Sequence, residues 1–382
     1  MAYKNLPNLR FSGFSEEWKE EPLENIIEFL KGNDSGNYKL PILTISAGKG
    51  WMLQSDRFGN VLAGNELKNY TLLKKGQLSY NHGNSKLAKY GAVFSLKDYN
   101  EALVPKVYHS FKILNGDSDF IERLFESKKT DRQLRKMITS GARMDGLLNI
   151  NKQSFGSILI NFPTLIEQKK IGDFFAKQDK LIELQTQKVD QLKKLKRGYL
   201  QKMFPQEGET VPRLRFSGFS GEWKEVTFGE CYSINTGKSK YFINDNGKYA
   251  IAGSKGIIGY DSDYDYSGSF VMVSRVGEAG SMYELDGKLK ITDNTIFIQT
   301  NYNKYLSGLL TNRNINKLSQ GSGRQIIKSS DLKRIKINTA NFSEQKKIND
   351  CIILIDKILK LELKKLNELK RQKKAYLQKM FI

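Results

Sequence analysis

The chain has 382 residues and a formal net charge of +21, with 39% hydrophobic and 11% aromatic residues. This length allows two to four domains, and the apolar content allows packed cores, which excludes a wholly disordered chain. The sequence has no apolar run of 18 residues and no apolar signal core near its start. We therefore expect neither a membrane span nor export, and a cytoplasmic protein.

The excess of positive charge favours a polyanion, and most simply a nucleic acid, as the partner. One alternative is a basic surface that only aids solubility. Another is a membrane-binding surface, although basic membrane-binding helices usually expose an apolar face. The two cysteines, Cys231 and Cys351, belong to no C-x-x-C pair, and the chain has two histidines, so we expect no structural zinc site.

The chain opens with a phrase that returns in its second half. Residues 9–20 read LRFSGFSEEWKE, and residues 214–225 read LRFSGFSGEWKE, at a shift of 205. Two further phrases also occur twice, at a shift of 177: EQKKI at 167–171 and 344–348, and YLQKMF at 199–204 and 376–381. These two phrases start 32 residues apart in both copies, whereas the opening phrase starts 158 residues before EQKKI in the first half and 130 in the second. The chain therefore has two halves with a constant closing segment and unlike middles.

The first domain is expected to span residues 1–163. Short β-branched and apolar runs, such as those at 41–46 and 91–96, alternate with turn signals and predict a mixed α+β domain with an irregular sheet. Short helices are expected at 118–140. The turns of this domain carry the first set of candidate DNA-reading residues: Lys49, Asn81, His82 and Arg143.

Residues 164–204 carry apolar side chains at steps of three, four and seven, which predicts one long amphipathic helix. Pro163 and Thr164 suit its start, and Pro205 suits its end. The helix would be about 60 Å long, and residues 341–382 show the same stripe. Because a lone helix of this kind cannot bury its stripe, we expect the two copies to pair as a coiled coil. Parallel pairing is possible, but we favour the antiparallel form because it gives both halves equivalent environments around a pseudo-twofold axis.

Residues 205–213 contain proline, glycine and acidic residues and are interpreted as an exposed linker. The second domain is expected at 214–340, where runs such as 268–274 and 294–300 again predict strands of an α+β fold. A short helix is expected near 301–319. The glycine-rich loops of this domain carry the second set of candidate DNA-reading residues: Ser254, Lys255, Arg275, Arg324 and Gln325.

Both sets of candidate residues are chosen by the chemistry of base recognition. Arg pairs with O6 and N7 of guanine, and Asn or Gln pairs with N6 and N7 of adenine, while glycine lets the backbone approach the groove. The alternative for each residue is an ordinary surface turn, or a phosphate contact, which is the commoner role of such side chains.

No catalytic constellation is recognisable in the sequence. The TGKS stretch at 236–239 lacks the glycine that a phosphate-binding loop needs, because Tyr232 occupies that position. Asp261, Asp263 and Asp265 do not follow the spacing of a calcium loop. The Asp- or Asn-Pro-Pro-aromatic tetrapeptide of DNA amino-methyltransferases is absent. We therefore expect a DNA reader that is not itself an enzyme and holds no metal.

The phrase LRF-x-GF-x-x-EW at the start of each half, with EQKKI at the head of each long helix, resembles the DNA-specificity (S) subunits of type I restriction-modification systems. The phrases GSKGIIGY, RVGEAGS and GSGRQIIKSSDLKRIKI are similar to one subtype of target-recognition domain in that family. YTLLKKGQLSYNHGNS and GARMDGLLNI are similar to another subtype. The likeness covers essentially the whole chain.

The resemblance implies that each middle is a target-recognition domain that reads one half of an asymmetric, bipartite site, and that the helices set the unread gap. It implies partnership with double-stranded DNA, two methylation (M) subunits and restriction (R) subunits, and with no membrane. It implies no cofactor in this chain, S-adenosylmethionine on the M subunits, and ATP and magnesium on the R subunit. A DNA-bridging scaffold or transcription regulator is the main alternative, and a nuclease in its own right is a third.

Overall fold

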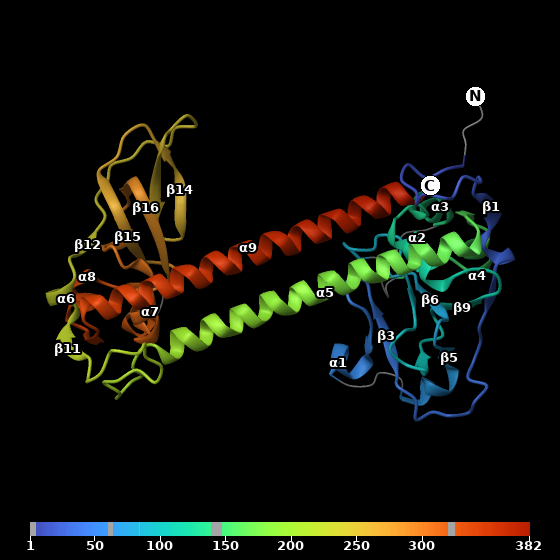
Figure 1. Ribbon diagram of the computed structural model, residues 1–382, viewed down its shortest axis with the longest axis horizontal. Coiled ribbons are helices and arrows are strands. Elements are labelled where there is room, and N and C mark those ends of the chain that lie inside the picture. The colour runs from blue at the N-terminus through green and yellow to red at the C-terminus, as the bar shows by residue number, and fades with distance from the viewer. Residues whose placement is uncertain (1–4, 60–63, 84, 139–146, 320–324) are drawn as a thin grey trace. The chain divides into compact units, whose positions relative to one another are not determined.

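The computed structural model describes residues 5–59, 64–83, 85–138, 147–319 and 325–382 (Figure 1). The chain divides into two compact units: unit 1, with residues 1–185 and 365–382, and unit 2, with residues 186–364. Each unit holds one α+β domain and a part of each long helix. In the described ranges, no helix is both long and apolar enough to cross a membrane.

Unit 1 is built on a four-stranded antiparallel sheet with three smaller strand pairs. The sheet has the order β2 (Ile27–Phe29), β9 (His109–Ile113), β6 (Leu78–Asn81) and β7 (Ala92–Ser95). Two of the strand pairs, also antiparallel, join β3 (Leu43–Ser46) to β4 (Gly50–Leu53), and β5 (Thr71–Lys74) to β8 (Glu101–Val104). The helices are α1 (Gln54–Phe58), α2 (Ser118–Glu126), α3 (Asp131–Met137) and α4 (Lys152–Gly156), with 3-10 turns η1 (Leu23–Asn25) and η2 (Gly64–Asn69).

The short helices expected at 118–140 are present as α2 and α3. Asp117 caps α2 by accepting a hydrogen bond from the backbone N–H of Phe120 at 2.9 Å. Lys128, between the two helices, has a φ of 66°, a left-handed conformation that a continuous helix cannot contain.

A buried imidazole pair anchors the segment before α4 to the sheet of unit 1. The rings of His82 and His109 stack with their centroids 4.9 Å apart. Nδ1 of His82 lies 2.7 Å from the carbonyl oxygen of Leu148, and Nε2 of His109 lies 2.8 Å from that of Ile150. Burial lowers the pKa of His109 to about 4, although its contact with the Ile150 carbonyl acts in the opposite direction. At neutral pH His109 is therefore uncharged and donates its Nε2–H to that carbonyl.

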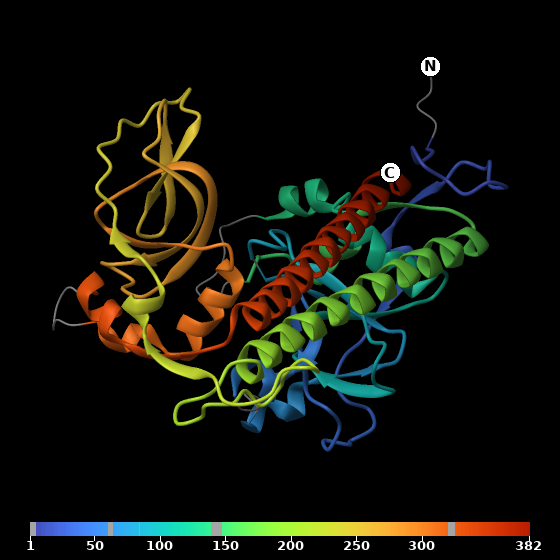
Figure 2. The same cartoon turned by 60° about the vertical axis from the view of Figure 1, so that its left-hand side comes forward.

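Unit 2 is built on a six-stranded sheet. Its order is β12 (Ile234–Thr236), β17 (Thr295–Gln299), β15 (Tyr266–Ser274), β16 (Met282–Ile291), β13 (Tyr249–Gly253) and β14 (Gly256–Asp261). All neighbours are antiparallel except β13 and β16, which are parallel. The helices are α6 (Phe228–Cys231), α7 (Asn303–Asn312) and α8 (Ser329–Arg334), with the 3-10 turn η3 (Ile315–Leu318). Helices α7 and α8 lie at one end of this sheet, and α7 is close to α9 (Figure 2).

The two long helices are α5 (Leu165–Lys202) and α9 (Phe342–Met380), close to the expected ranges 164–204 and 341–382. They run antiparallel within each unit. In unit 1 the Phe174 ring packs on Tyr376, and in unit 2 Lys196 pairs with Asp356. Buried apolar side chains recur along both helices with coiled-coil spacing; they include Ile171, Phe175 and Val189 on α5 and Ile348, Ile352 and Leu366 on α9. The prediction of an α+β protein with two long antiparallel helices is therefore confirmed.

Each opening phrase leads into the same two-stranded antiparallel sheet. In unit 1 this sheet joins β1 (Lys19–Pro22) to β10 (Leu159–Phe162), the strand directly before α5. In unit 2 it joins β11 (Lys224–Thr227) to β18 (Lys336–Thr339), the strand directly before α9. The sheet therefore fixes the point at which each domain passes into its long helix.

A buried ion pair links each opening phrase to the first turn of its helix. Arg10 donates from Nε and Nη2 to both carboxylate oxygens of Glu167, at 2.7 Å each. In unit 2, Arg215 makes the same two-fold contact with Glu344 at 2.7 and 2.8 Å. Both carboxylates are fully buried, so their charges depend on the arginines for compensation.

The tryptophan of each opening phrase packs against the end of the other long helix. In unit 1, Trp18 is buried and meets the Phe381 ring edge-on. In unit 2, Trp223 is buried and meets the Phe204 ring edge-on. Since Phe204 and Phe381 close the repeated phrase YLQKMF, the three repeated phrases meet at one junction in each unit.

The buried ion pair predicts a large effect of a single substitution. Arg215→Met leaves the carboxylate of Glu344 buried without its partner and is expected to lower the free energy of unfolding by about 3–5 kcal/mol. Arg213→Met is a matched control, because Arg213 pairs with Glu209 at an exposed position and is expected to cost less than about 1 kcal/mol. Urea unfolding of the full chain, followed by tryptophan fluorescence, measures both. Equal losses for the two variants would contradict the role of the buried pair.

Candidate nucleic-acid interfaces

Three loops of unit 2 that the sequence singled out lie together. The turn between β13 and β14 holds Ser254 and Lys255, and Lys255 Nζ pairs with Glu278 in the loop after β15 at 2.7 Å. That loop also contacts the segment after residue 324, because Val276 forms an antiparallel bridge with Ile326. The structure therefore brings residues 254–255, 275–278 and 325–327 to one region of the domain.

The loop between β15 and β16 is held in one shape by its own backbone. Ser274 donates its hydroxyl to the Val276 carbonyl at 2.9 Å, and the backbone N–H of Gly280 donates to the Ser274 carbonyl at 2.9 Å. Gly280 has a φ of 88°, and a Cβ there would lie 2.3 Å from Oδ1 of Asn316. Only glycine fits this position, which explains the second glycine in the phrase RVGEAGS.

The candidate side chains of unit 2 differ in their exposure. Lys255 and Gln325 are exposed, while Ser254 and Arg275 are half-buried. The Nη1 of Arg275 donates to the Asp293 carbonyl at 2.6 Å, and its Nε is buried without a hydrogen-bond partner. Arg275 therefore holds the loop at its base in this structure, and it would have to turn outward to reach a base edge. Arg324 lies outside the described residues.

Glu278 is the residue of this region that the sequence interpretation missed. Its pairing with Lys255 lowers the pKa of its carboxyl, so it is charged at neutral pH. A carboxylate repels phosphates but can accept a hydrogen bond from N4 of cytosine. Its place in the loop RVGEAGS, three residues after Arg275, was the available signal.

The candidate loops of unit 1 also lie together. Asn81, at the end of β6, donates from Nδ2 to the Ile45 carbonyl at 3.3 Å, which places it next to the β3–β4 turn that carries Lys49. Gly83 forms an antiparallel bridge with Leu147. Lys49 is exposed and Asn81 is half-buried. Both remain predictions.

Two candidates of unit 1 have different outcomes. His82 is only 8% exposed, and its Nδ1 and Nε2 lie 2.7 and 2.9 Å from the carbonyl oxygens of Leu148 and Val107. Its ring is part of the core and is not available to DNA in this conformation, so we correct the prediction that it contacts bases. Arg143 lies outside the described residues.

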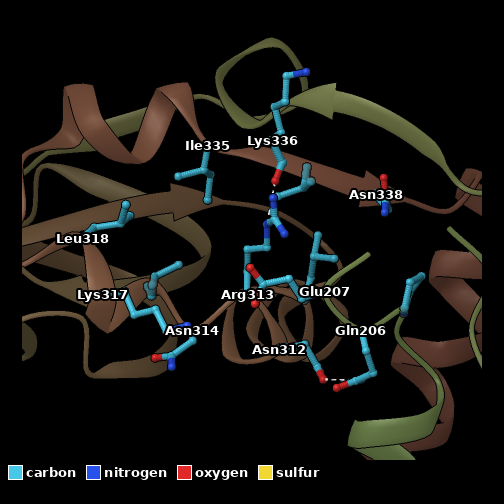
Figure 3. Close-up of a pocket in the computed structure, with 14 residues that line it drawn as sticks. Gln206, Glu207, Asn312, Arg313, Asn314, Lys317, Leu318, Ile335, Lys336 and Asn338 are labelled. Atoms are coloured by element: carbon cyan, nitrogen blue, oxygen red, sulfur yellow. Dashed lines mark hydrogen bonds between the residues drawn. The ribbon is translucent and has the colours of Figure 1, made fainter. Parts of the chain in front are cut away.

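A cavity of about 280 Å³ lies in unit 2, where the segment after α5 meets α7 and β18 (Figure 3). Arg313 donates from Nε to the Lys336 carbonyl at 2.7 Å, and Gln206 donates to Oδ1 of Asn312 at 3.1 Å. None of the candidate DNA-reading residues that the structure describes lines it. The contact of Gln206 with Asn312 attaches the expected linker to the second domain.

The carboxylates in the phrase DSDYDY surround a lysine. Nζ of Lys290 lies 2.5 Å from Asp263 and within 4.0 Å of Asp261 and Asp265. The Lys290 side chain is buried and also donates to the Lys240 carbonyl at 2.9 Å. These acids thus neutralise a buried cation and hold the start of β15 against β16.

Comparison with known proteins also points to DNA specificity. The family described as "Type I restriction modification DNA specificity domain" matches residues 220–371, from the opening phrase of the second half into α9. The specificity subunit of the type I restriction enzyme MjaVIII from Methanocaldococcus jannaschii is 24% identical over 294 residues, which are 66% of this chain and 67% of that protein.

Two solved structures share the fold. The S subunit of a type I restriction-modification system from M. genitalium is 16% identical, with 99% of each chain covered and a TM-score of 0.62. A chain from a structure that describes complex assembly and conformational transition of a type I restriction-modification system is 15% identical, with 95% of this chain and 97% of that chain covered and a TM-score of 0.54. Residues 220–371 thus match a type I restriction-modification DNA specificity domain, and the chain is similar to specificity subunits of type I restriction-modification systems.

Proposed function

We propose that each domain of this chain reads one half of an asymmetric DNA site for a type I restriction-modification complex. The observation that carries this proposal is the contrast between constant and variable parts. The junctions at Arg10–Glu167 and Arg215–Glu344 are the same in both units, whereas the sheets differ in strand number and order. Two different recognition domains that join the long helices in the same way suit a DNA site with two different halves.

The charge of the chain supports DNA as the ligand. A formal charge of +21 attracts a phosphate backbone without regard to sequence. Base selection then falls to the loop clusters, around Lys255 and Glu278 in unit 2 and around Lys49 and Asn81 in unit 1. Phosphate contacts position such a protein, and base contacts at a few loops specify the sequence.

The outer faces of the long helices support two equivalent partner sites. Leu181 and Leu184 of α5 are exposed, and so are Ile358 and Leu361 of α9, with exposed fractions between 37 and 59%. These pairs occupy matching positions of the 177-residue repeat. Apolar residues that stay exposed at matching positions are typical of a protein interface. We infer that one methylation subunit docks on each pair.

The catalytic groups would then belong to the partners. The methylation subunits would bind S-adenosylmethionine and transfer a methyl group to N6 of adenine, and the restriction subunits would use ATP and magnesium. This chain would recognise the target sequence and provide the surface on which the other subunits assemble, and it would contribute no catalytic residue.

Mapping of N6-methyladenine across a genome tests the proposal. Cells that carry the methylation subunit with this chain are expected to show a split, asymmetric motif that is absent from cells without the chain. As a control, the methylation subunit is shown to be active with another specificity subunit. If no new motif accompanies this chain under those conditions, a DNA-bridging protein becomes the better account.

Lys255→Ala tests the loop cluster of unit 2. The variant complex is expected to bind the target duplex about 1–3 kcal/mol more weakly, with the loss at one half-site only. Lys336→Ala is the matched control, because Lys336 is also exposed and ion-paired in unit 2, with Glu225 at 2.8 Å, but lies on β18. Fluorescence anisotropy with duplexes altered in one half-site measures both variants. Equal affinities of the two variants would remove Lys255 from the interface.

A further inference from the structure

The repeat preserves one acid–lysine pair between the long helices of each unit. In unit 1, Nζ of Lys373 on α9 lies 2.5 Å from Asp179 on α5. In unit 2, Nζ of Lys196 on α5 lies 2.5 Å from Asp356 on α9. Asp179 and Asp356 are 177 residues apart, and so are Lys196 and Lys373. The two pairs are therefore equivalent under the internal repeat.

In unit 1 the first domain adds two members to this pair. Arg123 of α2 donates to Asp179 at 2.7 Å and to Glu126 at 2.5 Å. Glu126 in turn accepts from Lys373 at 2.6 Å. The side chains of Arg123 and Lys373 are 8 and 13% exposed. Burial opposes the charge of Arg123, but the surrounding carboxylates outweigh it and raise the pKa of its guanidinium.

In unit 2 the second domain also adds two members, but from different places. Lys304, in the first turn of α7, pairs with Asp356 at 3.0 Å and with Glu284 of β16 at 2.8 Å. Burial alone would raise the pKa of Asp356, but Lys196 and Lys304 outweigh it and lower that pKa. The two domains have different sequences at these contacts. Each nevertheless supplies one cation and one acid to the equivalent acid–lysine pair on the long helices.

Each domain also contacts its helix at a second point. In unit 2, Oδ1 of Asn349 on α9 accepts from the backbone N–H of Lys304 at 3.1 Å, seven residues before Asp356. In unit 1, Oε1 of Gln168 on α5 accepts from the backbone N–H of Asp117, the cap of α2, at 2.9 Å. One contact point would leave a domain free to pivot on its helix, whereas two points about 10 Å or more apart along the axis fix its angle.

We propose that these two charge clusters, Asp179–Lys373–Arg123–Glu126 in unit 1 and Asp356–Lys196–Lys304–Glu284 in unit 2, set the angle of each recognition domain on the helices and thereby select the gap between the two half-sites. The proposal rests on the proposed function, because it needs a bipartite target. Asp179, Lys196, Asp356 and Lys373 are positioning residues and contact no base. Since several carboxylates and cations share each cluster, its geometry is more restricted than that of a single exposed pair.

The test compares DNA gaps. The chain, assembled with its methylation subunits, is titrated with duplexes that carry both half-sites at the native gap and at gaps one base pair shorter and longer. The variants are Asp179→Asn with Lys373→Met for unit 1, and Asp356→Asn for unit 2. The control is Lys188→Met with Glu362→Gln, which removes a lysine–acid pair of 2.6 Å whose members both belong to the long helices.

We expect the preference of the wild-type complex for the native gap to fall by about tenfold in each cluster variant, the size of a typical coupling within one ion-pair network. The control variant and the charge-conserving Lys373→Arg are expected to keep that preference. If a cluster variant loses affinity equally at all gaps, or keeps the wild-type preference, the proposal is overturned. If the unit 1 variant fails to assemble, the milder Asp356→Asn in the more exposed cluster decides the matter. A wild-type complex without any gap preference would instead refute the proposed function.

Discussion

The buried contact between arginine and glutamate at each junction is the constraint on which the rest of the structure depends. Glu167 and Glu344 begin the long helices, and Arg10 and Arg215 belong to opening phrases that lie far away in sequence. A pair of this kind adds little net stability compared with an apolar replacement, but either partner alone is costly. The pair therefore makes the fold conditional on one contact: the first turn of each long helix is correctly placed only when the arginine of the opening phrase binds its glutamate.

This condition explains why the chain repeats its opening and closing phrases. The opening phrase contacts the start of one long helix through its arginine and the end of the other through its tryptophan. Trp18 meets Phe381, and Trp223 meets Phe204. Each junction thus needs all three repeated phrases, whereas the domain between them needs only to begin and end at the small two-stranded sheet. The domains are in this way free to differ, and their sheets do differ.

The sequence predicted those parts of the fold that depend on local periodicity. The long helices were found because their apolar stripes repeat over many turns, and their antiparallel pairing followed from the symmetry of the repeat. Strand order was beyond sequence reasoning, because pairings such as the parallel contact of β13 with β16 join distant segments. Short helices were expected at 118–140, but the position of the break at Lys128 was not predicted, because no glycine or proline marks it.

The loops that carry the candidate residues could also be located from local sequence patterns, and their role in DNA reading stays a prediction. Glycine-rich loops are easy to recognise in the sequence, and in the structure the loops of each unit lie close together. His82 was misjudged because a histidine in a turn-rich phrase suggests exposure, while its partners, the carbonyls of Val107 and Leu148, come from distant segments. Glu278 was missed because its pairing with Lys255 exists only in the folded domain. The charge clusters on the helices likewise combine a repeated pair with residues that no repeat marks.

The central claim is that one chain reads two separate half-sites through two unlike domains. Chemical modification interference tests it most directly, with the assembled complex bound to a duplex that carries its methylated target. The account predicts two clusters of bases whose modification blocks binding, separated by a stretch that tolerates modification on both strands. A single continuous cluster, or no base whose modification matters, would contradict it.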